Sequence, residues 1–83
     1  MKGVLIMRNE YRIRLQNSEQ AEDFVRLAGT YDFDIDLLYN KIIVDAKSIL
    51  GVLSLDLSNI LTVKCNVKDE SFENEIRKYS VIQ

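Results

Sequence analysis

The chain of 83 residues contains no histidine and no proline, and it has a single cysteine. Without histidine it lacks the side chain that most often serves as a general base near neutral pH and as a metal ligand. No serine therefore has a histidine base, and no oxyanion hole is identifiable, for Ser18, Ser48, Ser54, Ser58, Ser71 and Ser80. The sequence predicts a protein that is not an enzyme, with no metal site and no cofactor.

Glycine and cysteine are also scarce, and both shortages exclude a class of site. Gly3, Gly29 and Gly51 stand too far apart to form a phosphate-binding loop. Cys65 cannot form an internal disulfide, which fits the reducing cytoplasm where we expect the protein. Alternation places this thiol on the inner face of a strand, so we expect a small core residue instead of a redox sensor.

An excess of one charge is missing as well. Thirteen acidic and eleven basic residues are interspersed and give a net charge of −2, which argues against nucleic acid or a membrane surface as partner. The apolar run 4–7 is too short for a membrane span or a secretion signal. Residues 1–9 have no assigned place: they could be an edge strand, an arm onto a neighbouring molecule or disordered, which leaves the oligomeric state open.

The chain has no linker, no low-complexity tract and no internal repeat, so we expect a single domain over residues 1–83. Although 47% of the residues are hydrophobic, a chain of this length buries only a little more than ~60% of its unfolded surface. We therefore expect modest stability.

The first half of the chain predicts a strand, a helix and a hairpin. Alternating apolar residues predict a strand over 11–16, and Asn17 or Ser18 can cap a helix that ends at Gly29. Its apolar positions follow the helical spacing i, i+3, i+4, i+7, at Ala21, Phe24, Val25 and Ala28. Residues 33–39 and 42–46 predict two strands joined by a turn at 40–41.

Three carboxylates, Asp32, Asp34 and Asp36, alternate with the inner-face residues of the first hairpin strand. Alternate residues on a strand lie about 6.8 Å apart, so these carboxylates line up along the strand and do not converge on one ion. We interpret them as a solvated strand face in preference to a calcium site.

The second half predicts two helices around one strand. A short helix over 48–55 is expected to rest on the sheet through Ile49, Val52 and Leu53. The strand over 61–67 points alternate residues inward, including Cys65 and Val67. A last helix begins around 69–71, and its continuation through Val81 and Ile82 is left open. The aromatic residues are expected in the core or half-buried: Tyr11, Phe24, Phe33, Tyr39, Phe72 and Tyr79.

The order of elements is therefore β-α-β-β-α-β-α. All the helices must bury their apolar faces against the same sheet. This predicts an α+β fold with a four-stranded antiparallel sheet and three helices on one face.

Two stretches, residues 31–40 and 45–55, resemble HPr, the small phosphocarrier of the bacterial sugar phosphotransferase system. The resemblance is densest over the Lys-Ser-Ile-x-Gly-Val-x-Ser-Leu pattern, which begins at Lys47. It implies an open-faced β-sandwich of the same topology and a cytoplasmic protein with protein partners.

The same resemblance identifies what the chain lacks. HPr carries its phosphoryl group on a histidine at the start of the first helix, followed by an arginine and a proline, and an ungapped match places Asn17, Glu19 and Gln20 there. An asparagine amide is not a usable phosphoryl acceptor because its nitrogen lone pair is delocalised. Glu19 also puts a negative charge where the family has a positive one. Phosphohistidine transfer is excluded.

Ser48 matches the serine that a dedicated kinase phosphorylates in many HPr proteins, and catabolite-repression HPr keeps this serine while lacking the histidine. The resemblance thus implies Ser48 as a regulatory phosphorylation site and implies a partner such as HPr serine kinase or a carbon-catabolite regulator. The alternative is an ordinary helix cap, worth about 1 kcal/mol and never modified.

Lys47, Ile49, Leu50 and Leu53 are the candidates for contact with a partner, because the last three match the apolar contact patch of the family. Two functions follow from the sequence. The first is an HPr-like regulatory or interaction protein that carries no phosphohistidine. The second is a degenerate small α/β module with a structural or ligand-binding role.

Overall fold

The elements follow in the order that the sequence predicts, over residues 9–81, which are the residues that the computed structural model describes. They are β1 (Asn9–Ile13), α1 (Ser18–Ala28), β2 (Ile35–Tyr39), β3 (Ile42–Asp45), α2 (Ile49–Leu53), β4 (Leu61–Cys65) and α3 (Glu70–Ile76), with a 3₁₀ turn, η1 (Arg77–Tyr79), after α3.

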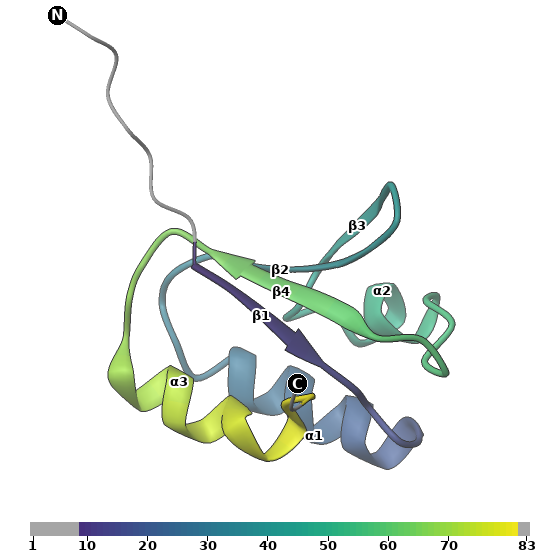
Figure 1. The fold of residues 1–83 in the computed structure, drawn as a ribbon, viewed down its shortest axis with the longest axis horizontal. Coiled ribbons are helices and arrows are strands. Elements are labelled where there is room, and N and C mark those ends of the chain that lie inside the picture. Colours follow the sequence, from purple (N-terminus) through teal and green to yellow (C-terminus); the bar gives the residue numbers. More distant parts are fainter. Residues whose placement is uncertain (1–8, 82–83) are drawn as a thin grey trace, which may run out of the picture.

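The four strands form one sheet in the order β1-β4-β2-β3, and each neighbouring pair is antiparallel. Two strands that run in the same direction, β1 and β2, are connected by α1 and have β4 between them. In the same way α2 connects β3 to β4 across β2. Figure 1 shows α1 and α3 below the sheet and α2 at the end near the β2–β3 hairpin. The predicted α+β fold is confirmed, and the opposite face of the sheet is open.

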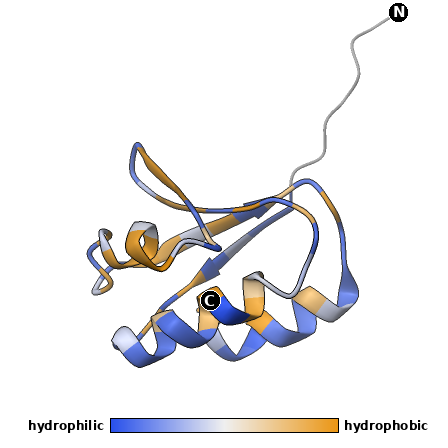
Figure 2. Ribbon diagram, turned by 180° about the vertical axis from the view of Figure 1, so that it is seen from behind, coloured by the Kyte–Doolittle hydropathy of each residue, from blue (hydrophilic) through white to orange (hydrophobic). Residues whose placement is uncertain are grey.

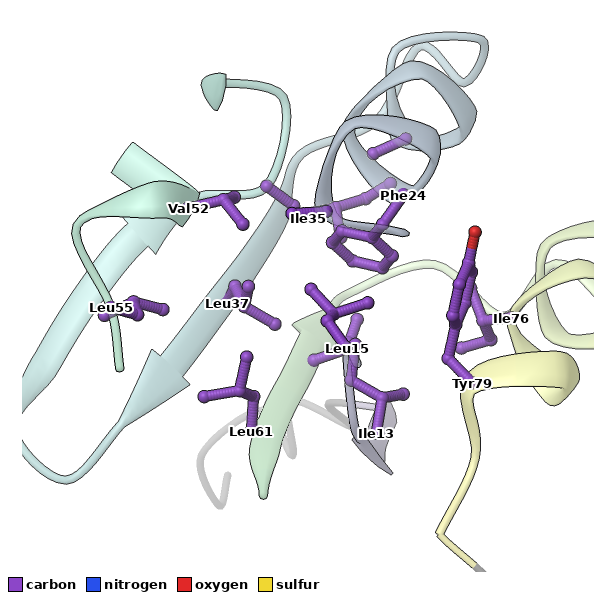
Figure 3. Close-up of a cluster of buried hydrophobic side chains, with 14 of the residues drawn as sticks. Ile13, Leu15, Phe24, Ile35, Leu37, Val52, Leu55, Leu61, Ile76 and Tyr79 are labelled. Carbon is purple, nitrogen blue, oxygen red and sulfur yellow. The ribbon is translucent and has the colours of Figure 1, made fainter. Parts of the chain in front are cut away.

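Strand alternation builds the core on the covered face. Leu37 and Val63 are neighbours across β2 and β4 and are fully buried. Figure 3 shows that aliphatic residues from β1, β2, β4 and α2 meet Phe24 of α1 and Tyr79 of η1 in one cluster. Cys65 is only 4% exposed, which confirms its predicted place in the core.

A cluster of aromatic rings attaches α3 to the sheet. Phe72 is fully buried, and its ring centroid lies 6.3 Å from that of Tyr11, 5.2 Å from that of Tyr31 and 5.9 Å from that of Phe33. The side chain of Asp69 caps α3 by accepting a hydrogen bond from the Phe72 backbone N–H at 2.8 Å. Phe72 is therefore one of the two buried residues that hold α3 on the core, together with Ile76.

The predicted first strand, 11–16, was wrong at both ends, because β1 runs from Asn9 to Ile13. At its end β1 also pairs with residues 79–81 on the side away from β4: the Arg14 N–H donates to the Tyr79 carbonyl, and the Val81 N–H donates to the Arg12 carbonyl. Val81 consequently does not extend the last helix. Residues 1–8 and Ile82 lie outside the described residues.

The second helix is shorter than predicted. It covers Ile49–Leu53 instead of 48–55, since Ser48 is its N-cap and Ser54 its C-cap. Leu53, which we expected to rest on the sheet, is 41% exposed, whereas Val52 and Leu55 are buried. A five-residue helix turns only one narrow face to the sheet, so its last residue points away.

Two further strands are shorter than predicted: β4 ends earlier and β2 begins later. Val67 follows β4 and is 41% exposed, so its predicted inward position was wrong. Asp32 and Asp34 precede β2, so only Asp36 of the three carboxylates lies in a strand. The hairpin turn at 40–41 is confirmed, with Asn40 at a φ of 56°, in the left-handed region that asparagine tolerates better than most residues.

Candidate functional site

The N-terminus of α1 is the first region that the sequence singled out. Asn17 is the N-cap of α1, and its side-chain oxygen accepts a hydrogen bond from the Gln20 backbone N–H at 2.9 Å. The Gln20 side chain in turn accepts from the Gln16 backbone N–H at 2.8 Å. Both side chains thus satisfy backbone donors around the helix start, which stabilises the helix.

The serine singled out by the sequence, Ser48, caps α2. Its Oγ accepts a hydrogen bond from the Gly51 backbone N–H at 3.1 Å, and its backbone N–H donates to the Asp45 carbonyl at 3.0 Å. The side chain is half-buried, and a Cβ on Gly51 would come within 3.3 Å of the serine Oγ. Ser48 is therefore the N-cap of α2, and its hydroxyl oxygen satisfies a backbone donor in the first turn of the helix.

Lys47, a predicted partner-binding residue, forms two hydrogen bonds within the protein. Its ammonium group donates to the Tyr31 carbonyl at 2.7 Å, and its backbone N–H donates to the Asp45 carboxylate at 2.9 Å. The side chain joins the turn before α2 to the segment that follows α1. The sequence could not predict this role because Tyr31 is 16 residues away.

The apolar residues of α2 differ in exposure. Leu50 is 80% exposed, Leu53 is 41% exposed and Ile49 is half-buried. We refer to these three as the α2 surface. Figure 2 shows α2 as a hydrophobic helix, in contrast to the hydrophilic outer side of α1. The predicted lack of a core role for Leu50 is confirmed, because Val52 and Leu55 make the buried contacts.

A groove between α1 and α2 extends the α2 surface. It has a volume of about 390 Å³ and is lined by Ile49 together with Glu22, Val25 and Arg26 of α1. The sequence does not point to the three α1 residues, because helical spacing places Val25 on the buried stripe and does not reveal which helix lies next to α1. The structure brings α1 and α2 into contact.

Acidic side chains gather at another place, on the open face of the sheet. Asp36 lies directly opposite Asp45 across β2 and β3, and on its other side it lies opposite Lys64 of β4. Lys64 forms an ion pair with Glu10 at 3.5 Å. Within residues 9–81, no group of three or more carboxylate or thiol side chains has an arrangement that could hold a metal ion.

A hydrogen-bonded network lies where α3 meets β1. Glu73 accepts hydrogen bonds from the Tyr11 hydroxyl and from Lys68, and these bonds lower the pKa of its carboxyl. Burial, together with the hydrogen bond to Glu73, raises the pKa of Tyr11. The network connects a carboxylate on α3 to the Tyr11 hydroxyl of β1 and to the Lys68 ammonium group.

This network predicts a pH dependence of stability. Because the pKa of Glu73 is lower in the folded than in the unfolded chain, its stabilising effect is present above about pH 4.3 and is lost as the pH falls through the folded value. We expect the free energy of unfolding to decrease from about pH 5 to about pH 3 more steeply in the wild type than in Glu73→Gln. Urea titrations across this range measure both slopes, and equal slopes would contradict the assignment.

Among residues 9–81, no helix combines the length and the apolar character that crossing a membrane requires. The α2 surface, the capping serine and the groove beside α1 lie next to one another in the described part of the chain.

Comparisons with known proteins give the fold a context. Residues 17–78 match the protein-family model described as the PTS HPr component phosphorylation site. The chain is similar to HPr-C-His from Thermoanaerobacter tengcongensis, with a TM-score of 0.72 and 24% identity over 84% of this chain and 88% of that one. It is also similar to the phosphocarrier protein HPr from Bacillus anthracis str. Ames, with a TM-score of 0.68 and 23% identity over 89% of this chain and 98% of that one. No curated protein matches the chain.

Proposed function

Because this chain belongs to the HPr family, we propose that it is a regulatory or interaction protein of the phosphotransferase type that works without a phosphohistidine. None of its 83 residues is a histidine, so the phosphoryl acceptor of the family is missing. We assign the position of that acceptor to Asn17, the N-cap of α1. The protein would act in the cytoplasm by contact with other proteins and not by catalysis.

One observation supports an interaction role above all others. Leu50 is 80% exposed on a helix whose packing against the core is already provided by Val52. A single exposed leucine is common on protein surfaces. Leu50, however, is not isolated. Leu53 lies on the same helix, and the groove between α1 and α2 begins at Ile49, so an extended surface lies beside Ser48.

Phosphorylation of Ser48 is the regulatory step that we propose for this surface. A phosphoryl group would add about −1.5 to −2 charges next to Leu50 and would displace the Oγ from its hydrogen bond with the Gly51 N–H. The Asp45 carboxylate nearby would add to the negative potential. The α2 surface would change from apolar to anionic, so a partner that binds one state would discriminate against the other.

The test is incubation with HPr serine kinase and ATP, followed by intact-mass and peptide mass spectrometry. We expect a gain of about 80 Da, one phosphoryl group, located on Ser48, and no gain in Ser48→Ala. Ser54→Ala is the matched control, because Ser54 lies at the other end of α2 and donates to the Gly51 carbonyl. This variant should still be phosphorylated on Ser48.

A second arm tests the α2 surface itself. Leu50→Glu should slow the phosphorylation of Ser48 about tenfold or more if the kinase contacts this leucine. Ile60→Glu changes a residue that is 47% exposed and lies outside α2, and it should leave the rate unchanged. Failure of the wild type to gain phosphate would favour the alternative function, a degenerate module with a structural or ligand-binding role.

A further inference from the structure

The strand β3 forms one edge of the sheet, and it is unusually apolar for an edge. Among the strands of residues 9–81 it neighbours only β2, and Ile42 and Ile43 are 52% and 62% exposed. Figure 2 colours most of the β2–β3 hairpin as hydrophobic. Edge strands with unpaired main-chain groups and apolar side chains tend to pair with another strand.

The hydrogen-bonding pattern shows which main-chain groups β3 presents at this edge. The Ala46 N–H donates to the Ile35 carbonyl on β2 at 2.9 Å. Because the direction alternates along an antiparallel strand, Ile42 and Val44 also bond to β2, while the main-chain groups of Lys41, Ile43 and Asp45 point outward. A second strand would form main-chain hydrogen bonds with these three residues.

The sequence of this edge is complementary to itself. In an antiparallel pair of two β3 strands that places Ile43 opposite Ile43, Lys41 of each copy faces Asp45 of the other, and Ile42 faces Val44. The other registers that satisfy the outward groups place Lys41 opposite Lys41 or Ile43, or Asp45 opposite Asp45 or Ile43. Only one register therefore matches both the charges and the apolar residues.

The charges already on the open face favour the same partner. Asp45 lies opposite Asp36, and like charges directly opposite each other on a sheet are destabilising. The nearest cation in the sheet, Lys64, lies on the far side of Asp36 and is paired with Glu10. One oxygen of Asp45 accepts from the Lys47 N–H, and a carboxylate has further acceptor positions for a lysine from a second copy.

From these observations we infer that β3 is a dimerisation edge, at which a second copy of this chain pairs antiparallel through Lys41, Ile42, Ile43, Val44 and Asp45. Ile43 lies on the two-fold axis, and the two sheets join into one of eight strands. The contact surface of two short strands is small, so the dimer is weak and forms at high protein concentration. This dimer uses neither Ser48 nor Leu50 and does not depend on the proposed function.

Sedimentation velocity of the full chain from about 10 µM to about 1 mM tests the inference. We expect the mass to rise toward twice that of the monomer in the wild type. Ile43→Lys places two ammonium groups together on the axis and should weaken the dimer at least about tenfold. Val67→Lys is the matched control, since Val67 is 41% exposed but lies after β4, away from this edge, and should not change the mass.

A mixing experiment tests the register. Lys41→Asp makes the edge wholly acidic and Asp45→Lys makes it wholly basic, so each variant alone should remain monomeric, whereas an equimolar mixture should dimerise. A folded spectrum by NMR for each variant is required first. A wild type that stays monomeric at about 1 mM, a dimer that survives Ile43→Lys, or a mixture that stays monomeric would each overturn the inference.

Discussion

Replacement of Phe72 with alanine is expected to lower the free energy of unfolding by about 3–5 kcal/mol. Phe72 is fully buried, and its ring makes edge contacts with three other aromatic rings, those of Tyr11, Tyr31 and Phe33. Truncation removes these ring contacts and leaves a cavity in the core, which is why the expected loss has the size that is typical of buried phenylalanines.

Because the chain is short, this loss is a large fraction of its total free energy of unfolding. At about 0.05–0.15 kcal/mol per residue, a chain of 83 residues is stable by only about 4–12 kcal/mol. Urea denaturation followed by circular dichroism measures the difference. Phe33→Ala is the matched control, because Phe33 is half-buried in the same cluster and its loss should cost less. A decrease below about 1 kcal/mol for Phe72→Ala would contradict the assigned role.

Incubation with phosphoenolpyruvate, Enzyme I and an authentic HPr is expected to leave this chain without any acid-labile phosphate. None of its residues offers an imidazole nitrogen, which accepts and releases a phosphoryl group near neutral pH. The nitrogen lone pair of the Asn17 amide is delocalised, and the amide oxygen accepts a hydrogen bond from the Gln20 N–H. Phosphate labelling measured after acid and base treatment distinguishes phosphohistidine from phosphoserine. Acid-labile label on the wild type would end the proposal.

Two variants test the assignment of Asn17 as the position of the missing acceptor. Asn17→His combined with Glu19→Arg restores an imidazole at the N-cap of α1 and a positive charge in its first turn, and we expect measurable acid-labile label. The matched control, Ser18→His with Glu19→Arg, moves the imidazole one residue along the helix, and we expect it to stay unlabelled. Equal labelling of the two variants would contradict the assignment.

Much of the fold could be predicted because local patterns in this chain agree with its tertiary structure. The apolar spacing at Phe24 and Ala28 gave α1, alternation through Val63 and Cys65 gave β4, and Asn40 marked the hairpin turn. The errors lie where a partner distant in sequence decides the outcome. The end of β1 depends on the segment after η1, and the exposure of Leu53 depends on how α2 lies on the sheet.

The candidate site divides in the same way. Ser48 as a cap and Leu50 as a residue without a core role follow from short-range spacing, and the structure agrees with both. The attachment of Lys47 to the Tyr31 carbonyl and the groove that Val25 shares with Ile49 could not be predicted. Both depend on the contact of α1 with α2, two helices separated in the chain by a hairpin.

The sequence by itself determined which elements form, the buried faces of α1 and β4 and that no histidine is present to accept a phosphoryl group. These properties depend on residue type and on spacings of two to four residues, which the printed chain contains in full. Only the tertiary structure decided the strand order β1-β4-β2-β3, and with it that β3 is an edge and that α1 lies beside α2. Strand order depends on pairings between residues far apart in the chain, and for these a local pattern contains no information.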